Sequence, residues 1–124
     1  MKILLIEDNE QIRKMLNRKF RKTDWEIHEA ENGQVGVEAA FKLQPDLILM
    51  DMHMPVMDGH EATRFLRANK YRGKIAALTA SVMHSDNKEA LKDGCDYFIQ
   101  KPIAKDFLSQ IKDILDRPNE HKDE

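Results

Sequence analysis

The chain has 124 residues, of which 34% are charged and 41% hydrophobic, with a formal net charge of -2 and a single cysteine. This size fits one domain with one buried core and excludes a wholly disordered chain. The sequence has no second cysteine for an internal disulfide or a CxxC metal site, no apolar run long enough to cross a bilayer, and no charge excess that would attract nucleic acid or an anionic membrane. Because no signal-peptide pattern follows Met1, we expect a cytoplasmic protein.

Short apolar runs that fit strands alternate with segments of helical periodicity along the whole chain. In chain order, the pattern predicts a strand over residues 2–6, a helix over 11–22, a strand over 25–30, a helix over 34–43, a strand over 47–50, a helix over 59–68, a strand over 74–78, a helix over 85–92, a strand over 97–99 and a helix over 104–115. Pro118 and the charged residues after it predict a frayed end. We therefore expect one domain over residues 1–116 and a polar tail over residues 117–124.

Five strands that alternate with five helices predict an α/β fold, in which helices cover both faces of a parallel sheet. Right-handed crossovers leave few topologies for such a sheet. The half-polar strand 25–30 fits an edge position, whereas the apolar strands 2–6 and 47–50 fit the middle. These features fit a flavodoxin-like (βα)5 three-layer sandwich with strand order 2-1-3-4-5.

Polar residues follow four of the predicted strands, at the positions where the strands end. Glu7 and Asp8 follow the first strand, Asp51 the third and Thr79 the fourth, and Lys101 comes soon after the fifth. In an open parallel sheet, ligands bind beyond the carboxyl ends of the strands. Acids, a hydroxyl and an amine on one rim therefore indicate a functional site rather than ordinary polar loops.

Three ionised carboxylates on adjacent strand ends would repel one another, by about 3 kcal/mol per pair at ~5 Å and an effective dielectric constant of ~20. Such a cluster holds either a proton or a cation. Oxygen ligands without a nearby cysteine favour a hard ion, so we expect Mg²⁺. A magnesium ion beside a carboxylate, a hydroxyl and a lysine predicts phosphoryl transfer, with one carboxylate as the nucleophile.

Four motifs carry a resemblance to a known family: KILLIEDN, DMHMPVMDG, the TA of residues 79–80, and GCDYFIQKPI. Through them, residues 1–116 resemble the receiver domain of two-component response regulators, and most of all the receivers joined to hybrid histidine kinases. The resemblance implies a phosphoprotein of a phosphorelay, a signalling module rather than an enzyme with an external substrate. It also implies a histidine kinase or a histidine phosphotransfer domain as phosphodonor and an output protein or domain downstream, with no direct binding to nucleic acid.

The resemblance also implies a role for each acidic residue of the site. Asp51 would accept the phosphoryl group from a phosphohistidine. Asp8 would bind Mg²⁺ directly and Glu7 largely through water. Asp51 itself and the backbone carbonyl of His53 would complete the protein ligands.

The remaining implied roles concern stabilisation of the phosphoryl group and the conformational switch. Thr79 would move its hydroxyl onto the acyl phosphate, and Lys101 would pair with a phosphoryl oxygen. A cis peptide bond before Pro102 would aim the lysine. Phe98 stands where the family places its switch aromatic, often a tyrosine, and Tyr97 should point to the opposite face of the strand.

Two further positions are expected to set the lifetime of the phosphoryl group. His53 and Ser81 each lie two residues after a predicted site residue, where side chains would flank the path of an attacking water. The alternative is that both are plain exposed loop residues.

The predicted helix 11–22 carries many basic residues without an acid among them, and helical spacing places Arg13, Lys14, Asn17, Arg18 and Arg21 on one side. This side is either a solvated face or a docking surface for an acidic helical partner. RNA binding is the weaker third reading, because no aromatic residues are interleaved with the basic ones.

Three other functions would each need different residues from those that the sequence has, or fewer of them. An aspartyl phosphatase of the haloacid dehalogenase type would need a DxD motif after the first strand, whereas the nearest triplet, residues 51–53, reads DMH after the third. A flavodoxin would need a phosphate-binding loop rich in serine and threonine where residues 7–9 read EDN. An inactive receiver, acting by interaction alone, would not need the complete set of polar strand-end residues. The sequence fits either a stand-alone regulator or one domain of a longer chain.

Overall fold

The fold is described from a computed structural model of the chain, for residues 1–54, 57–79 and 84–121. Five parallel strands form one sheet in the order β2-β1-β3-β4-β5, so the predicted fold class and strand order are confirmed. The strands are β1 (Lys2–Ile6), β2 (Glu26–Ala30), β3 (Leu47–Asp51), β4 (Ile75–Thr79) and β5 (Tyr97–Gln100). The helices are α1 (Glu10–Phe20), α2 (Gly33–Leu43), α3 (Gly59–Ala68), α4 (His84–Asp93) and α5 (Phe107–Asp116).

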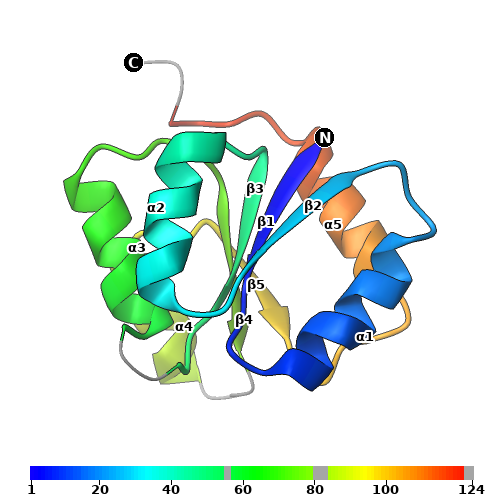
Figure 1. Cartoon of the computed structure of the whole chain (residues 1–124). Helices are drawn as coiled ribbons and strands as arrows, with labels where there is room; N and C mark the ends of the chain where they lie inside the picture. Colours follow the sequence, from blue (N-terminus) through cyan, green and yellow to red (C-terminus); the bar gives the residue numbers. More distant parts are fainter. Residues whose placement is uncertain (55–56, 80–83, 122–124) are drawn as a thin grey trace.

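Helices cover both faces of the sheet, with α2, α3 and α4 on one face and α1 and α5 on the other (Figure 1). Alternate residues of each central strand face opposite layers. In β1, Leu4 and Ile6 pack in the core on the α2–α3–α4 side, whereas Ile3 and Leu5 pack on the α1–α5 side. Strands that are buried on both faces must be largely apolar, which is why β1, β3 and β4 each contain a continuous apolar run.

Three helices begin at residues whose side chains accept a hydrogen bond from the backbone of the first turn. Asn9 caps α1 by accepting from the Ile12 N–H at 3.1 Å, and Asn32 caps α2 by accepting from the Val35 N–H at 2.9 Å. Asp58 caps α3 in the same way, 2.9 Å from the Glu61 N–H. Such caps satisfy backbone donors that have no partner within the helix and fix where each helix begins.

Two predicted helix boundaries differ from the structure by more than one residue. The helix expected over 11–22 ends at Phe20, because the Lys22 and Thr23 N–H groups bond three residues back, to the carbonyls of Lys19 and Phe20, in a tightened final turn. The helix expected over 104–115 begins at Phe107, after a turn in which the Phe107 N–H bonds the Ala104 carbonyl.

The residues after α5 are not frayed, in contrast to the prediction, as far as the structure describes them. They run across the end of the sheet at which the strands begin (Figure 1). The Asn119 side chain donates to the Arg72 carbonyl at 2.9 Å, and the His121 ring lies 2.6 Å from the Asp96 carboxylate. The sequence pattern could not show these contacts, because their partners lie 47 and 25 residues away.

Among the described residues, no helix combines the length and the apolar character needed to cross a membrane.

Candidate functional site

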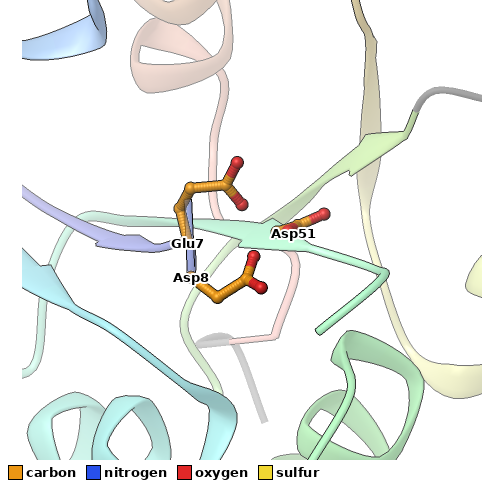
Figure 2. Close-up of side chains that lie close together, drawn as sticks. All are labelled: Glu7, Asp8 and Asp51. Atoms are coloured by element: carbon orange, nitrogen blue, oxygen red, sulfur yellow. The ribbon is translucent and has the colours of Figure 1, made fainter. Parts of the chain in front are cut away.

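Three carboxylates converge at the carboxyl end of the sheet. Glu7 and Asp8 directly follow β1, Asp51 is the last residue of β3, and β1 and β3 are neighbours whose register pairs Ile6 with Met50. One carboxylate oxygen of each acid lies within 4.8 Å of the other two (Figure 2). Two adjacent parallel strands that end at the same level therefore create the cluster.

These three acids differ strongly in their exposure to water. Glu7 is fully buried, Asp51 is 3% exposed, and Asp8 lies at the surface. Glu7 and Asp51 continue the strand alternation that points toward the α1–α5 layer, so both side chains leave the sheet on the same face. The site is thus a buried acidic pair with one exposed acid at its mouth.

The Lys101 ammonium group bridges the buried pair. Its Nζ lies 3.2 Å from Oε1 of Glu7 and 3.2 Å from Oδ1 of Asp51. Lys101 follows β5, and its backbone N–H donates to the carbonyl of Thr79 at 2.8 Å, which fixes the chain beside the end of β4. The expected cis peptide bond between Lys101 and Pro102 is confirmed.

A buried carboxyl group holds a proton more tightly than one in water. Burial raises the pKa of Glu7 from 4.5 to about 8, and a hydrogen bond with Asp51 and the negative charge of Asp51 raise it as well, while Lys101 lowers it. One ammonium group therefore does not offset two buried carboxylates at neutral pH, and the pair retains a proton.

The donor set of this cluster fits a divalent cation. Within the part of the chain that the structure describes, Oε2 of Glu7 is buried without a hydrogen-bond partner. The three acids offer oxygen ligands only, which suit a hard ion such as Mg²⁺. A cation bound here would take the place of the proton that the buried pair otherwise keeps.

The loop after β3 is tied to the site by two close approaches. The His53 N–H donates to Oδ1 of Asp51 at 3.2 Å, and the His53 side chain is exposed. Gly59 begins α3 directly against the end of β3, where an added Cβ would lie 2.3 Å from the Asp51 carbonyl oxygen. Any larger residue at position 59 would push α3 away from the strand that carries Asp51.

The loop after β1 is held by Arg13, a residue that the sequence predicts on the solvent-facing or docking side of the first helix. The Arg13 side chain is half-buried, and its guanidinium donates to the Glu7 carbonyl at 2.7 Å. The helical spacing could not reveal this bond, because it depends on how the chain turns between β1 and α1.

The predicted switch residues lie on the neighbouring strands. Thr79 ends β4 and is buried, and β4 pairs with β3 so that Leu78 lies beside Asp51. Phe98 in β5 is half-buried and packs against the core on the α2–α3–α4 side, whereas Tyr97 packs on the opposite side, as expected from strand alternation. Ser81 lies outside the described residues.

A known protein family matches most of this chain. The family described as the response regulator receiver domain matches residues 3–112. Hybrid signal transduction histidine kinase A of Dictyostelium discoideum is 39% identical over 120 residues, which cover 92% of this chain and 5% of the kinase. The chain thus spans a small fraction of the length of this relative.

Two solved structures have the same fold at moderate sequence identity. The receiver domain of the sensor histidine kinase PA1611 from Pseudomonas aeruginosa, which has a magnesium ion coordinated in its active site cleft, is 33% identical with a TM-score of 0.79, and the match covers 92% of this chain and 93% of that one. A chain in the complex of the Saccharomyces cerevisiae histidine phosphotransfer protein Ypd1 with the receiver domain of Ssk1 is 30% identical with a TM-score of 0.83, covering 90% and 85%.

Proposed function

Because the chain belongs to the response regulator receiver domain family, a family of signalling phosphoacceptors rather than turnover enzymes, we propose that Asp51 is the residue that accepts the phosphoryl group. The observation that carries the assignment is the position of Asp51, which is buried at the end of β3 with Lys101 Nζ at 3.2 Å and the carboxylates of Glu7 and Asp8 beside it. Lys101 also contacts Glu7, but of these two buried acids Asp51 is the one whose carboxylate accepts from the backbone N–H of His53 in the loop after β3.

Transfer to Asp51 is a displacement at phosphorus. A carboxylate oxygen of Asp51 forms the new bond to phosphorus while the phosphorus–nitrogen bond of the donor phosphohistidine breaks, and the donor imidazole leaves with the electron pair. The Lys101 ammonium lies where it can offset charge on the transferred group. The product is an acyl phosphate on a residue that was already surrounded by polar groups.

We assign Mg²⁺ as the cation of the site, held by Asp8, Asp51 and, through water, Glu7, with the His53 backbone carbonyl as a further ligand. When bound, the ion offsets the charge of the phosphoryl oxygens and of the clustered carboxylates. The buried, unpaired Oε2 of Glu7 supports a cation in this position. The magnesium ion in the receiver of PA1611, a 33% identical protein, supports the same choice.

The phosphodonor is proposed to be a histidine kinase or a histidine phosphotransfer domain. The similarity to hybrid histidine kinases and to a chain from the Ypd1–Ssk1 complex supports this class of partner. Exposed basic residues lie along α1 and at its C-terminal end, among them Arg18 and the C-cap residue Arg21, and they give an acidic partner a place to dock. Docking there would leave the surface of α4, β5 and α5 for an output protein or domain.

The output switch is proposed to run from Asp51 through Thr79 to Phe98. An acyl phosphate on Asp51 offers the Thr79 hydroxyl a charged acceptor, and a hydrogen bond of this kind contributes roughly 1.5–3 kcal/mol. Inward movement of Thr79 would let the half-buried Phe98 ring pack more deeply toward the core. A change of this size is sufficient to shift an equilibrium between two conformations by roughly tens- to hundreds-fold.

The proposal is tested by incubating the protein with a small phosphodonor and Mg²⁺ and measuring its intact mass. We expect one added phosphoryl group, which hydroxylamine removes because it cleaves acyl phosphates. Asp51→Asn keeps the shape of the side chain and removes the nucleophile, so this variant should remain unlabelled, whereas Asp46→Asn, at an exposed acid that precedes β3, should label like the parent. Labelling of Asp51→Asn at the parental rate would refute the assignment.

A further inference from the structure

A buried carboxylate joins α3 to the end of α4. Oδ2 of Asp93, the last residue of α4, is hydrogen-bonded to Nδ1 of His60, the second residue of α3. Oδ1 of the same carboxylate accepts from the Arg64 guanidinium at 2.8 Å, and the Asp93 side chain is 6% exposed. Because an ionised carboxylate can only accept hydrogen bonds, Nδ1 of His60 carries the proton, and the plane of the His60 ring is fixed.

The fixed His60 ring is in contact with the loop that follows the phosphoacceptor. The rings of His53 and His60 have their centroids 6.4 Å apart at an interplanar angle of 68°, an edge-to-face arrangement within the favourable range for aromatic pairs. The backbone N–H of His53 is bonded to Oδ1 of Asp51. Consecutive contacts therefore connect the end of β3 to the end of α4 through two histidine rings.

We propose that His60 and Asp93 are positioning residues that hold the His53 ring beside Asp51, and that they thereby couple the lifetime of the phosphoryl group to the position of α4. This inference rests on the proposed role of Asp51. An exposed histidine next to the site would otherwise occupy several rotamers. Contact with the fixed His60 ring keeps it in one place.

The reaction that this arrangement would slow is hydrolysis of the acyl phosphate. The oxygen of a water molecule bonds to phosphorus, the bond from phosphorus to the Asp51 oxygen breaks, and the carboxylate returns with its electron pair while the water proton passes to solvent. A held His53 ring narrows the approach of that water. A displaced α4 would withdraw Asp93, free both rings and shorten the lifetime.

Arg64 provides a matched control for these residues. It lies one turn after His60 on the same helix and binds the same carboxylate, but no contact with His53 is found for it among the described residues. Gly94, whose φ of 115° favours glycine, ends α4 directly after Asp93, so substitutions at position 93 leave the end of the helix defined. We call the series of contacts from Asp93 through His60 to His53 the relay. Five variants separate the relay from general packing of α3 on α4: His60→Ala, His60→Phe, Asp93→Ala, His60→Ala/Asp93→Ala and Arg64→Gln.

Two measurements test the relay: the half-life of the phosphoryl group after removal of the donor, and the imidazole NMR signals of His53 in the unphosphorylated protein. Loss of an aromatic contact changes an equilibrium by roughly two- to tenfold, and we expect His60→Ala and Asp93→Ala to shorten the half-life by this factor and to shift the His53 signals. In the double variant, the loss of Asp93 should add nothing to the loss of His60, because Asp93 acts through His60. Arg64→Gln should leave both measurements near the parental values.

Each other outcome overturns a stated part of the inference. Unchanged half-lives in His60→Ala and Asp93→Ala would refute the relay, and so would an equal shortening in Arg64→Gln, which would point to helix packing alone. His60→Phe keeps a ring against His53 but loses the bond to Asp93, so unaltered His53 signals in this variant would exclude Asp93 from the relay. A parent protein that takes up no phosphoryl group would refute the proposed function of Asp51 instead.

Discussion

The Glu7 carboxyl lies fully buried at the end of β1, with Asp51 and Lys101 as polar neighbours. Its pKa is raised to about 8, first by burial and then by Asp51. In the unfolded chain the same group would release its proton near its ordinary value of 4.5.

The first prediction at the residue scale concerns stability against pH. Between pH 4.5 and about 8 the native state binds a proton that the unfolded chain has released, so the free energy of unfolding should fall as the pH rises through this window. The loss should be complete above pH 8 and absent below pH 4.5. Thermal unfolding of the metal-free protein at a series of pH values measures this change in the free energy of unfolding. Glu7→Gln should flatten the decline, and Mg²⁺ should stabilise the parent more at pH 8 than at pH 5; a parallel decline in Glu7→Gln would contradict the assignment.

The second residue-scale prediction concerns Asp8, the exposed acid of the cluster. Asp8→Ala should abolish Mg²⁺-dependent phosphorylation, because the cation loses a direct ligand, yet it should leave the melting temperature unchanged or raised, because a repelling charge is removed. Intact-mass labelling and thermal unfolding measure the two effects. Asp116→Ala, at the exposed end of α5, serves as the control. Unaltered labelling of Asp8→Ala, or of the parent protein in the presence of a chelator, would contradict a requirement for Mg²⁺ at this site.

At the scale of elements, α1 presents exposed charges at the edge of the site. Lys14 is paired with Glu10 at 3.4 Å, and Arg13 is bonded to the Glu7 carbonyl, so Arg18 and Arg21 are the more available cations of the predicted basic side. Reversing both, in Arg18→Glu/Arg21→Glu, should slow transfer from a histidine phosphotransfer protein several-fold at low salt, because charges at an interface rim act mainly on association. Labelling by a small phosphodonor should not change.

A matched control separates docking from net charge. Lys42→Glu/Lys112→Glu reverses two exposed charges on α2 and α5 and alters the total charge equally. Equal slowing in both double variants would show that α1 is not the docking element.

The second prediction at this scale concerns the response of α4 and β5. Amide exchange with and without beryllofluoride should change over α4 and β5 and remain constant over α1, because Thr79 ends β4 between the site and these elements. Thr79→Ala removes the hydroxyl that would bond the acyl phosphate, so it should suppress the change while beryllofluoride still binds. Exchange that changed over α1 and α2 alone would place the switch elsewhere.

At the scale of the whole molecule, the two ends of the sheet have different roles. The carboxyl ends carry the site, whereas the opposite end is closed by Lys74, whose buried ammonium donates to the carbonyls of Ile114 at 2.7 Å and Leu115 at 3.3 Å, and by the residues after α5. Hydrogen bonds from a charged donor to the last carbonyls of a helix satisfy acceptors that have no partner within it. This end of the molecule therefore serves stability.

The prediction at this scale is that stability can be lowered there without loss of function. Lys74→Met should lower the free energy of unfolding by about 2–3 kcal/mol, because it removes the charged donor from the Leu115 carbonyl and leaves the Ile114 carbonyl with the Arg117 N–H alone. The melting temperature should fall by roughly 5–15 °C. Phosphoryl uptake at a temperature where the variant is folded should match the parent. Lys112→Met, exposed on α5, is the control. Lost uptake in folded Lys74→Met would show that the two ends are coupled.

The sequence predicts the order of the elements and the polar residues at the strand ends, and its half-polar and apolar strands fit the strand order that the structure shows. These features depend on residues close together in the chain: continuous apolar runs predict β1 and β3, and residues that directly follow parallel strands must gather at one edge. Helix ends were predicted less well, because the tightened turn after Phe20 depends on backbone bonds that the pattern of residue types does not specify.

The charge state and the contacts of the site depend on tertiary packing, which brings together residues that lie far apart in the sequence. Lys101 meets Glu7 across 94 residues and Asp51 across 50, and the raised pKa of Glu7 follows mainly from the burial of its carboxyl group. The bond between His60 and Asp93 and the docking of His121 on Asp96 likewise join residues 33 and 25 positions apart. Such contacts depend on how helices pack on the sheet, and packing is set by the whole chain at once.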